Sequence, residues 1–137
     1  LELYKQQGID TKSSAVEVVP FIEDMAAAYA WADFVICRAG ALTIAELTSA
    51  GLGALLIPFP FAIDDHQTVN GELLTDCGAA TLVQQNDLSA SRLAKQIKAV
   101  CGAPEKRLHM AMQARSLAKN NAAERVAEVC MEVGYGQ

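Results

Sequence analysis

The residues from Arg38 to Glu46 have the types and spacing from which a nucleotide site is built. Gly40 lies between Asp33 to Cys37, which predicts a buried strand, and Leu42 to Ala50, which predicts a helix. The first N–H groups of such a helix have no intrahelical acceptor, so they can donate to a phosphate. Glu46 follows about one turn later and can accept hydrogen bonds from a vicinal diol such as ribose. The stretch predicts a nucleotide site, with two alternatives open: such strand–turn–helix units also occur without a ligand, and Glu46 could be a solvated helix residue.

A second polar segment, Asp64-Asp65-His66-Gln67-Thr68 with Asn70, follows the next predicted strand. Gln67 and Asn70 lie on one face of a helix, where their neutral amides could donate to and accept from sugar hydroxyls. The open alternative is a polar helix cap followed by an exposed first turn. Asp65 and His66 are not predicted to form a general-base pair, because adjacent residues of a helix do not face each other.

Strand-like and helix-like segments alternate along the chain, and each polar segment follows a strand. We predict strands over 15–19, 33–37, 54–57 and 79–83, and helices over 25–32, 42–50, 66–77, 89–100, 104–117 and 122–133. Asp24 and Ser89 are predicted helix caps, and Trp31 is predicted to lie in the core. The alternation predicts an α/β fold with a parallel, Rossmann-like sheet, whose carboxyl edge would carry both polar segments.

The composition excludes several classes of protein. The 137 residues suit one domain, and the net charge of −5 without a basic block makes nucleic acid an unexpected partner. No apolar run approaches the ~20 residues of a membrane span, and no signal peptide is recognised. His66 and His109 are remote in sequence and no nucleophile arrangement stands out, so no metal, cofactor or catalytic residue is predicted. We interpret the four cysteines as reduced core thiols of a cytosolic protein: Cys37, Cys77, Cys101 and Cys130.

Four segments of the sequence are recognisable together: Phe21 to Asp33, Cys37 to Thr43 with Glu46, Pro58-Phe59, and Asp65 to Asn70. They closely resemble the MurG family, bacterial transferases that add N-acetylglucosamine to undecaprenyl-linked N-acetylmuramoyl-pentapeptide. The resemblance covers Val16 to Val83 in motif detail. It implies the GT-B architecture of two Rossmann-like domains, of which the C-terminal one binds UDP-N-acetylglucosamine.

The resemblance also implies a set of donor-binding residues. Ile22 would meet the uracil through its backbone, and Glu46 would hold the ribose diol. The family often carries Ser at the position of Ala39, so a contact from that hydroxyl is not available here. No catalytic residue, cofactor or metal is implied in this chain. The implied donor-binding set is Phe21, Ile22, Met25, Arg38, Gly40, Ala41, Leu42, Thr43, Glu46, Gln67, Thr68 and Asn70.

Compared with the family, residues 1–137 are expected to form only part of the C-terminal donor-binding domain, without the N-terminal acceptor domain and without the first strands of the sheet. The opening residues, which resemble the last turns of a helix ending at Gly8, also suggest a piece of a longer protein. In the usual strand order 3-2-1-4-5-6 the missing strands would lie between 16–19 and 33–37. Exposed sheet edges, and self-association through them, are therefore expected.

The expected function is UDP-N-acetylglucosamine binding for an inverting, GT-B, family 28-like hexosyltransferase that makes lipid II from lipid I in peptidoglycan synthesis, and so serves cell wall biogenesis, cell shape and cell division. Lipid I would bind through the absent N-terminal domain, and the fragment alone would be inactive. The expected location is cytoplasmic, with the parent protein peripheral on the cytoplasmic face of the inner membrane. The alternatives are a non-catalytic UDP-sugar-binding subunit that needs a partner chain and, less favoured, a UDP-sugar 2-epimerase.

Overall fold

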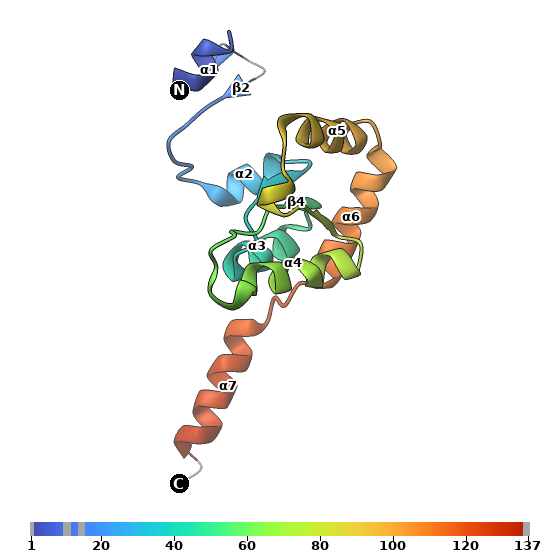
Figure 1. Cartoon of the computed structure of the whole chain (residues 1–137). Coiled ribbons are helices and arrows are strands. Elements are labelled where there is room, and N and C mark those ends of the chain that lie inside the picture. The colour runs from blue at the N-terminus through green and yellow to red at the C-terminus, as the bar shows by residue number, and fades with distance from the viewer. Residues whose placement is uncertain (1, 10–11, 14–15, 136–137) are drawn as a thin grey trace.

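Helices and strands alternate between residues 25 and 101 of the computed structural model, which describes residues 2–9, 12–13 and 16–135 (Figure 1). The elements in chain order are α1 (Glu2–Gln6), β1 (Lys12–Ser13), β2 (Val16–Glu17), α2 (Met25–Trp31), β3 (Val35–Cys37), α3 (Ala41–Ala50), β4 (Ala54–Leu56), the 3-10 turn η1 (Ile63–Asp65), α4 (His66–Asp76), β5 (Ala80–Leu82), the 3-10 turn η2 (Gln85–Asp87), α5 (Ala90–Cys101), α6 (Pro104–Ser116) and α7 (Ala122–Tyr135).

The central sheet has the order β3-β4-β5 and is parallel throughout. Ala54 of β4 is in register with Val35 of β3 and with Ala80 of β5, so the three strands end at one edge. This confirms the predicted parallel α/β sheet. The strand predicted over 15–19 does not join it: β2 pairs antiparallel with β1, and Ala15 lies outside the described residues. A strand of a parallel sheet pairs only with the strands that lie next to it in the strand order. In the usual order 3-2-1-4-5-6, other strands lie between the position of β2 and that of β3.

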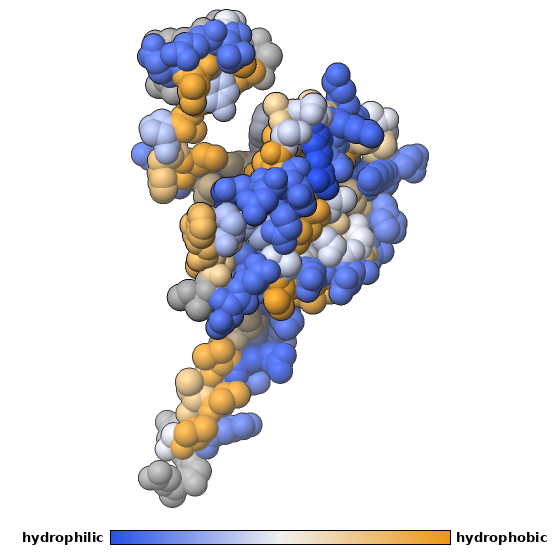
Figure 2. Space-filling model, viewed as in Figure 1, coloured by the Kyte–Doolittle hydropathy of each residue, from blue (hydrophilic) through white to orange (hydrophobic). Residues whose placement is uncertain are grey.

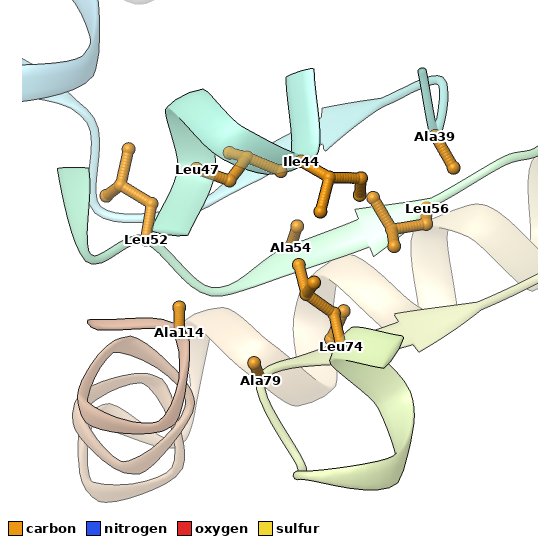
Figure 3. Close-up of a cluster of buried hydrophobic side chains, with 10 residues drawn as sticks. Ala39, Ile44, Leu47, Leu52, Ala54, Leu56, Leu74, Ala79 and Ala114 are labelled. Carbon is orange, nitrogen blue, oxygen red and sulfur yellow. The ribbon is translucent and has the colours of Figure 1, made fainter. Parts of the chain in front are cut away.

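The hydrophobic core surrounds β4, all of whose residues are buried. Leu47 of α3 and Leu74 of α4 pack around this strand together with Ala114 of α6 (Figure 3). Glycine permits the close approach of α6 to the start of β4, because a Cβ on Gly53 would lie 2.7 Å from the Cβ of Met110. The core thus fixes β4 and α3 relative to each other, and with them the turn at Gly40.

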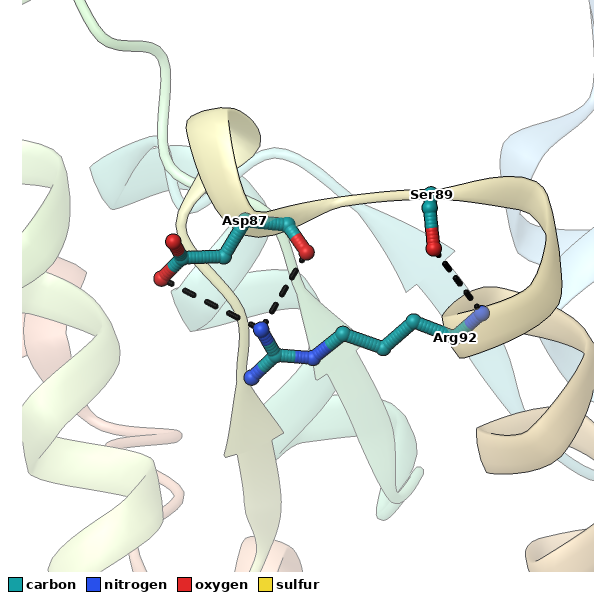
Figure 4. Close-up of polar contacts among 3 residues, drawn as sticks. All are labelled: Asp87, Ser89 and Arg92. Carbon is teal, nitrogen blue, oxygen red and sulfur yellow. Dashed lines mark hydrogen bonds and ion pairs between the residues drawn. The ribbon is translucent and has the colours of Figure 1, made fainter.

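The helix caps predicted from sequence form as expected. The Asp24 side chain accepts from the Ala27 N–H at 2.8 Å at the start of α2. The Ser89 hydroxyl accepts from the Arg92 N–H at 3.2 Å at the start of α5, and the Arg92 guanidinium donates back to the Asp87 carbonyl at 3.1 Å (Figure 4). Gly51 ends α3 in the left-handed conformation, with φ of 71°.

Two expectations about burial are wrong. Trp31 is 87% exposed rather than buried, because no element of the described chain covers that side of α2. Cys101 and Cys130 are exposed, whereas Cys37 and Cys77 are half-buried, so the four cysteines are free thiols but only two of them approach the core.

The last helix, α7, extends away from the α/β body (Figure 1). Figure 2 shows an apolar stripe along it, and the exposed apolar residues there are Val126, Val129, Met131 and Val133. No helix in the described ranges combines the length and hydropathy that crossing a membrane requires.

Candidate functional site

The turn at Gly40 lies at the carboxyl edge of the sheet, between β3 and α3. Gly40 has an extended backbone (φ −67°, ψ 147°), and the helix begins at Ala41. The first helical hydrogen bond runs from the Ile44 N–H to the Gly40 carbonyl at 2.9 Å. The N–H groups of Ala41, Leu42 and Thr43 precede this bond, as predicted for an anion-binding helix end. Leu42 is exposed, so this helix end is open to solvent.

Asn70 fixes the backbone on the strand side of this turn. Its side-chain amide donates to the carbonyl of Ala39 at 3.2 Å, joining α4 to the end of β3. Ala39 itself is fully buried, so its side chain contributes packing to the core. The structure therefore gives Asn70 a role in shaping the turn at Gly40.

Arg38 joins the end of β3 to two neighbouring segments. Its Nη1 donates to the carbonyls of Ile57 and Pro58 at 3.2 and 3.0 Å, just beyond β4. Its Nη2 donates to Oε1 of Gln85 at 2.6 Å, and the guanidinium lies over the Phe59 ring at 5.7 Å. The guanidinium therefore orders the backbone around the site through contacts within the protein.

The start of α4 is held by a second set of side-chain hydrogen bonds. The Phe59 N–H donates to Oε1 of Gln67 at 3.0 Å, which fixes the Gln67 amide and leaves its nitrogen as a donor. The Thr68 hydroxyl donates to Oδ1 of Asp65 at 2.7 Å and accepts from Nε2 of Gln84 at 3.0 Å. These bonds join the start of α4 to the segments that follow β4 and β5.

Asp64 and Asp65 have left-handed backbones, with φ of 52° and 50°. Aspartate enters this region more readily than most residues, although two in succession are uncommon. This tight turn redirects the chain into α4, with Gln67 and Thr68 in its first turn. The polar segments 38–46 and 65–70, remote in sequence, thus meet as predicted.

Glu46 is hydrogen-bonded to Tyr29 of the neighbouring helix. The Tyr29 hydroxyl donates to Oε2 of Glu46 at 2.9 Å. Burial, and then this bond to the carboxylate, raise the pKa of Tyr29 to about 12. A hollow of about 470 Å³ lies between α2 and α3, lined by Met25, Ala26, Tyr29, Ala30, Glu46, Ser49 and Ala50. Glu46 is therefore accessible but paired, and sequence reasoning missed Tyr29 because only the packing of α2 on α3 brings the two residues together.

The residues expected near the uracil lie on the exposed segment before α2 and at its first residue, Met25. Phe21 is 76% exposed, and Ile22 and Met25 are also accessible. Met25 borders the hollow that holds Glu46, and it also borders a second hollow with Phe21, Ile22 and Ile36. Met25 therefore lies between the hollow where the base is expected and the hollow where the ribose is expected.

No metal centre accompanies these groups in the ranges described. Those residues contain no cluster of three His, Cys, Asp or Glu side chains that could hold a metal ion. Burial raises the pKa of Cys37 to about 11, which keeps this thiol protonated near neutral pH and unreactive as a nucleophile. The polar groups gathered at this edge are backbone N–H groups, side-chain amides and one carboxylate.

A parallel sheet with a helix N-terminus and polar side chains at its carboxyl edge is the arrangement of a Rossmann-like ligand-binding domain. Residues 2–128 match the model of the glycosyltransferase family 28 C-terminal domain, so the chain belongs to that family.

Two curated relatives bear the name UDP-N-acetylglucosamine--N-acetylmuramyl-(pentapeptide) pyrophosphoryl-undecaprenol N-acetylglucosamine transferase. The one from Nitrosococcus oceani is 53% identical over 97% of this chain, and the one from Pseudomonas aeruginosa is 56% identical over 92%. A crystal structure of Acinetobacter baumannii MurG superposes with a TM-score of 0.79 at 42% identity, over 85% of this chain and 35% of that one. The chain spans only 36% and 35% of the length of the two curated relatives.

Proposed function

We propose that this chain is the donor-binding part of an N-acetylglucosaminyltransferase of peptidoglycan synthesis, with UDP-N-acetylglucosamine as its ligand. The observation that carries the proposal is the position of Glu46 one turn beyond the open N-terminus of α3. That spacing matches the step from a nucleotide's diphosphate to its ribose, in a chain 56% identical to a transferase named for this donor.

In this proposal, different groups at the carboxyl edge of the sheet bind different parts of the donor. The N–H groups of Ala41, Leu42 and Thr43 bind the diphosphate, and the carboxylate of Glu46 accepts from both ribose hydroxyls. Ile22 and Met25 line the base, and Gln67, with Thr68 beside it, donates to the sugar. Arg38 and Asn70 hold the backbone that presents these groups.

The chemical step is a direct displacement with inversion. The 4-hydroxyl of lipid I attacks the anomeric carbon, the bond to the UDP oxygen breaks, and the leaving diphosphate keeps its negative charge beside the N-terminus of α3. The base that takes the hydroxyl proton, and the lipid I site, belong to an acceptor domain beyond this chain. The complete protein then acts where lipid I is presented, at the cytoplasmic face of the membrane. The alternative of a non-catalytic subunit gains no support, since the curated relatives that match nearly the whole chain are named as transferases.

The proposal is tested by measuring donor binding to the complete gene product that carries this sequence. Glu46→Gln keeps the shape but replaces an acceptor oxygen with a donor, and it should weaken UDP binding about tenfold or more, since hydrogen bonds to charged groups contribute ~1.5–3 kcal/mol each. Glu105→Gln, on the exposed face of α6, is the matched control and should leave binding unchanged.

A double cycle with 2′-deoxy-UDP, measured by calorimetry, shows whether Glu46 contacts the ribose. The two changes remove the same interaction, so their effects should be far from additive. Additive effects would show that Glu46 does not hold the ribose. No preference of the complete protein for UDP-N-acetylglucosamine over other nucleotide sugars would overturn the proposed function as a whole.

A further inference from the structure

The hydrogen bond between Tyr29 and Glu46 joins α2 to α3 beside the proposed ribose site. The phenolic oxygen lies 2.9 Å from Oε2 of Glu46, and both side chains line the same hollow between the helices. The Tyr29 ring is half-buried and packs against the hydrophobic core, and this packing fixes the position of the ring. The Glu46 side chain is exposed, so it would otherwise sample several rotamers.

We propose that Tyr29 is a positioning residue that holds the Glu46 carboxylate ready to accept both ribose hydroxyls, and that it thereby contributes to the selection of ribonucleotides over deoxyribonucleotides. This inference rests on the proposed function, because it concerns the same donor site.

The lone pairs of the carboxylate allow the tyrosine and the diol to bind together. An ionised carboxylate has about four acceptor positions on its two oxygens, and Tyr29 uses one of them on Oε2. Oε1 and the remaining position on Oε2 stay available to two hydroxyls. A carboxylate that is already oriented loses less side-chain entropy on binding, so the bond raises affinity without touching the ligand.

The tyrosine acts as a donor throughout the neutral range. Burial and the Glu46 carboxylate raise its pKa to about 12, so the phenol keeps its proton. The Cys37 thiol, the other titratable group that acts on Tyr29, is also neutral because burial raises its pKa to about 11. The hydrogen bond therefore keeps its direction, with Tyr29 as donor and Glu46 as acceptor.

Tyr29→Phe isolates this contact, since it removes the hydroxyl and keeps the ring that packs on the core. In the complete gene product we expect UDP binding, measured by calorimetry, to weaken about fivefold, because one hydrogen bond to a carboxylate is lost. Binding of 2′-deoxy-UDP should weaken less, so the ribose preference falls. In turnover the KM for the donor should rise while kcat stays constant, and the melting temperature should change little.

Two controls separate positioning from a general structural effect. Ser116→Ala removes a hydroxyl that bonds to the Gln113 carbonyl on α6, away from the site, and should alter neither nucleotide affinity. In a Glu46→Gln background, Tyr29→Phe should have little further effect on UDP affinity, because the two residues act through one interaction.

The possible results distinguish this inference from the proposed function. If the protein prefers ribose and Glu46→Gln abolishes that preference, but Tyr29→Phe leaves it intact or weakens both nucleotides equally, only the role of Tyr29 is overturned. If the unmodified protein does not distinguish UDP from 2′-deoxy-UDP, both the ribose site and the role of Tyr29 are overturned.

Discussion

Arg38 shows how a side chain implied to bind substrate can serve the site through its contacts within the protein. Its guanidinium donates to the carbonyls of Ile57 and Pro58 and to the side chain of Gln85. Lysine has one nitrogen and cannot reach acceptors on both sides at once. We expect Arg38→Lys to lower the unfolding free energy of the ligand-free protein by ~1–2 kcal/mol, a value reduced for the exposure of these bonds, as measured by urea denaturation. Arg125→Lys on α7 is the control, and an unchanged ligand-free stability in Arg38→Lys would contradict the structural role.

Cys37 differs from the exposed cysteines in its reactivity. Burial raises its pKa from 9.0 to about 11, so at pH 8 only about one thiol in a thousand is the reactive thiolate. We expect iodoacetamide at pH 8 to modify Cys101 and Cys130 well before Cys37, as followed by peptide mass mapping, and denaturation in urea to remove the difference. Equal rates in the native protein would show that the Cys37 thiol is not shielded.

The raised pKa of Cys37 also predicts how the stability of the protein changes at alkaline pH. The folded-state pKa of Cys37 lies above its usual value, so the unfolded chain loses the proton first as the pH rises. The resulting contribution to stability is fully present below about pH 9 and is lost as the pH rises through about 11.

At the residue level, the sequence predicted best what depends on near neighbours. The caps at Asp24 and Ser89 follow from side chains that bond within three residues, and both form as predicted. Tyr29 and Trp31 could not be placed in this way, because Tyr29 depends on a contact with α3 and Trp31 lies on a side of α2 that no described element covers.

At the scale of elements, Gly53 allows helix α6 to pack closely against the start of β4. The residue precedes β4, and a methyl group there would lie 2.7 Å from the Cβ of Met110, an atom that moves only with α6 itself. We expect Gly53→Ala to destabilise the fold by ~1–3 kcal/mol through overpacking, measured as a shift in thermal unfolding. Gly134→Ala on α7 meets no atom within 4 Å and should leave the fold stable or favour its helix. Equal effects of the two substitutions would argue against a close contact between α6 and β4.

Among the elements, hydrophobic pattern and turn residues predicted α3, β4, α4 and β5 to within about two residues, because each is a local unit with its own stop signal. The strand expected at 15–19 shows the limit of that reasoning. Its apolar residues are strand-like, yet β2 pairs only with β1, since a strand's place in a parallel sheet is set by neighbours remote in sequence.

At the scale of the whole molecule, one side of the α/β body remains uncovered. β3 pairs with β4 on one side only within the described chain. Beside α2, a hollow of about 800 Å³ is lined by Val16, Glu17, Val19, Phe21, Ile22, Ala28 and Trp31. A neighbouring hollow reaches Ile36 of β3 itself. A parallel strand with one free edge, next to exposed aromatic side chains, is a surface that other chains tend to cover.

We therefore predict that this chain, expressed by itself, associates through the β3 edge and the surface around Trp31. Pairing would satisfy the free backbone groups of β3 and remove the exposed indole from water. Sedimentation equilibrium at micromolar concentrations should show dimers or larger species, and Trp31→Lys should shift them toward the monomer because a charge cannot enter such an interface without cost. Val129→Lys, at an exposed apolar residue of α7, is the control and should leave the association unchanged. A monomeric unmodified chain would contradict the prediction, and dissociation by Val129→Lys but not by Trp31→Lys would assign the contact to α7 instead of the sheet edge.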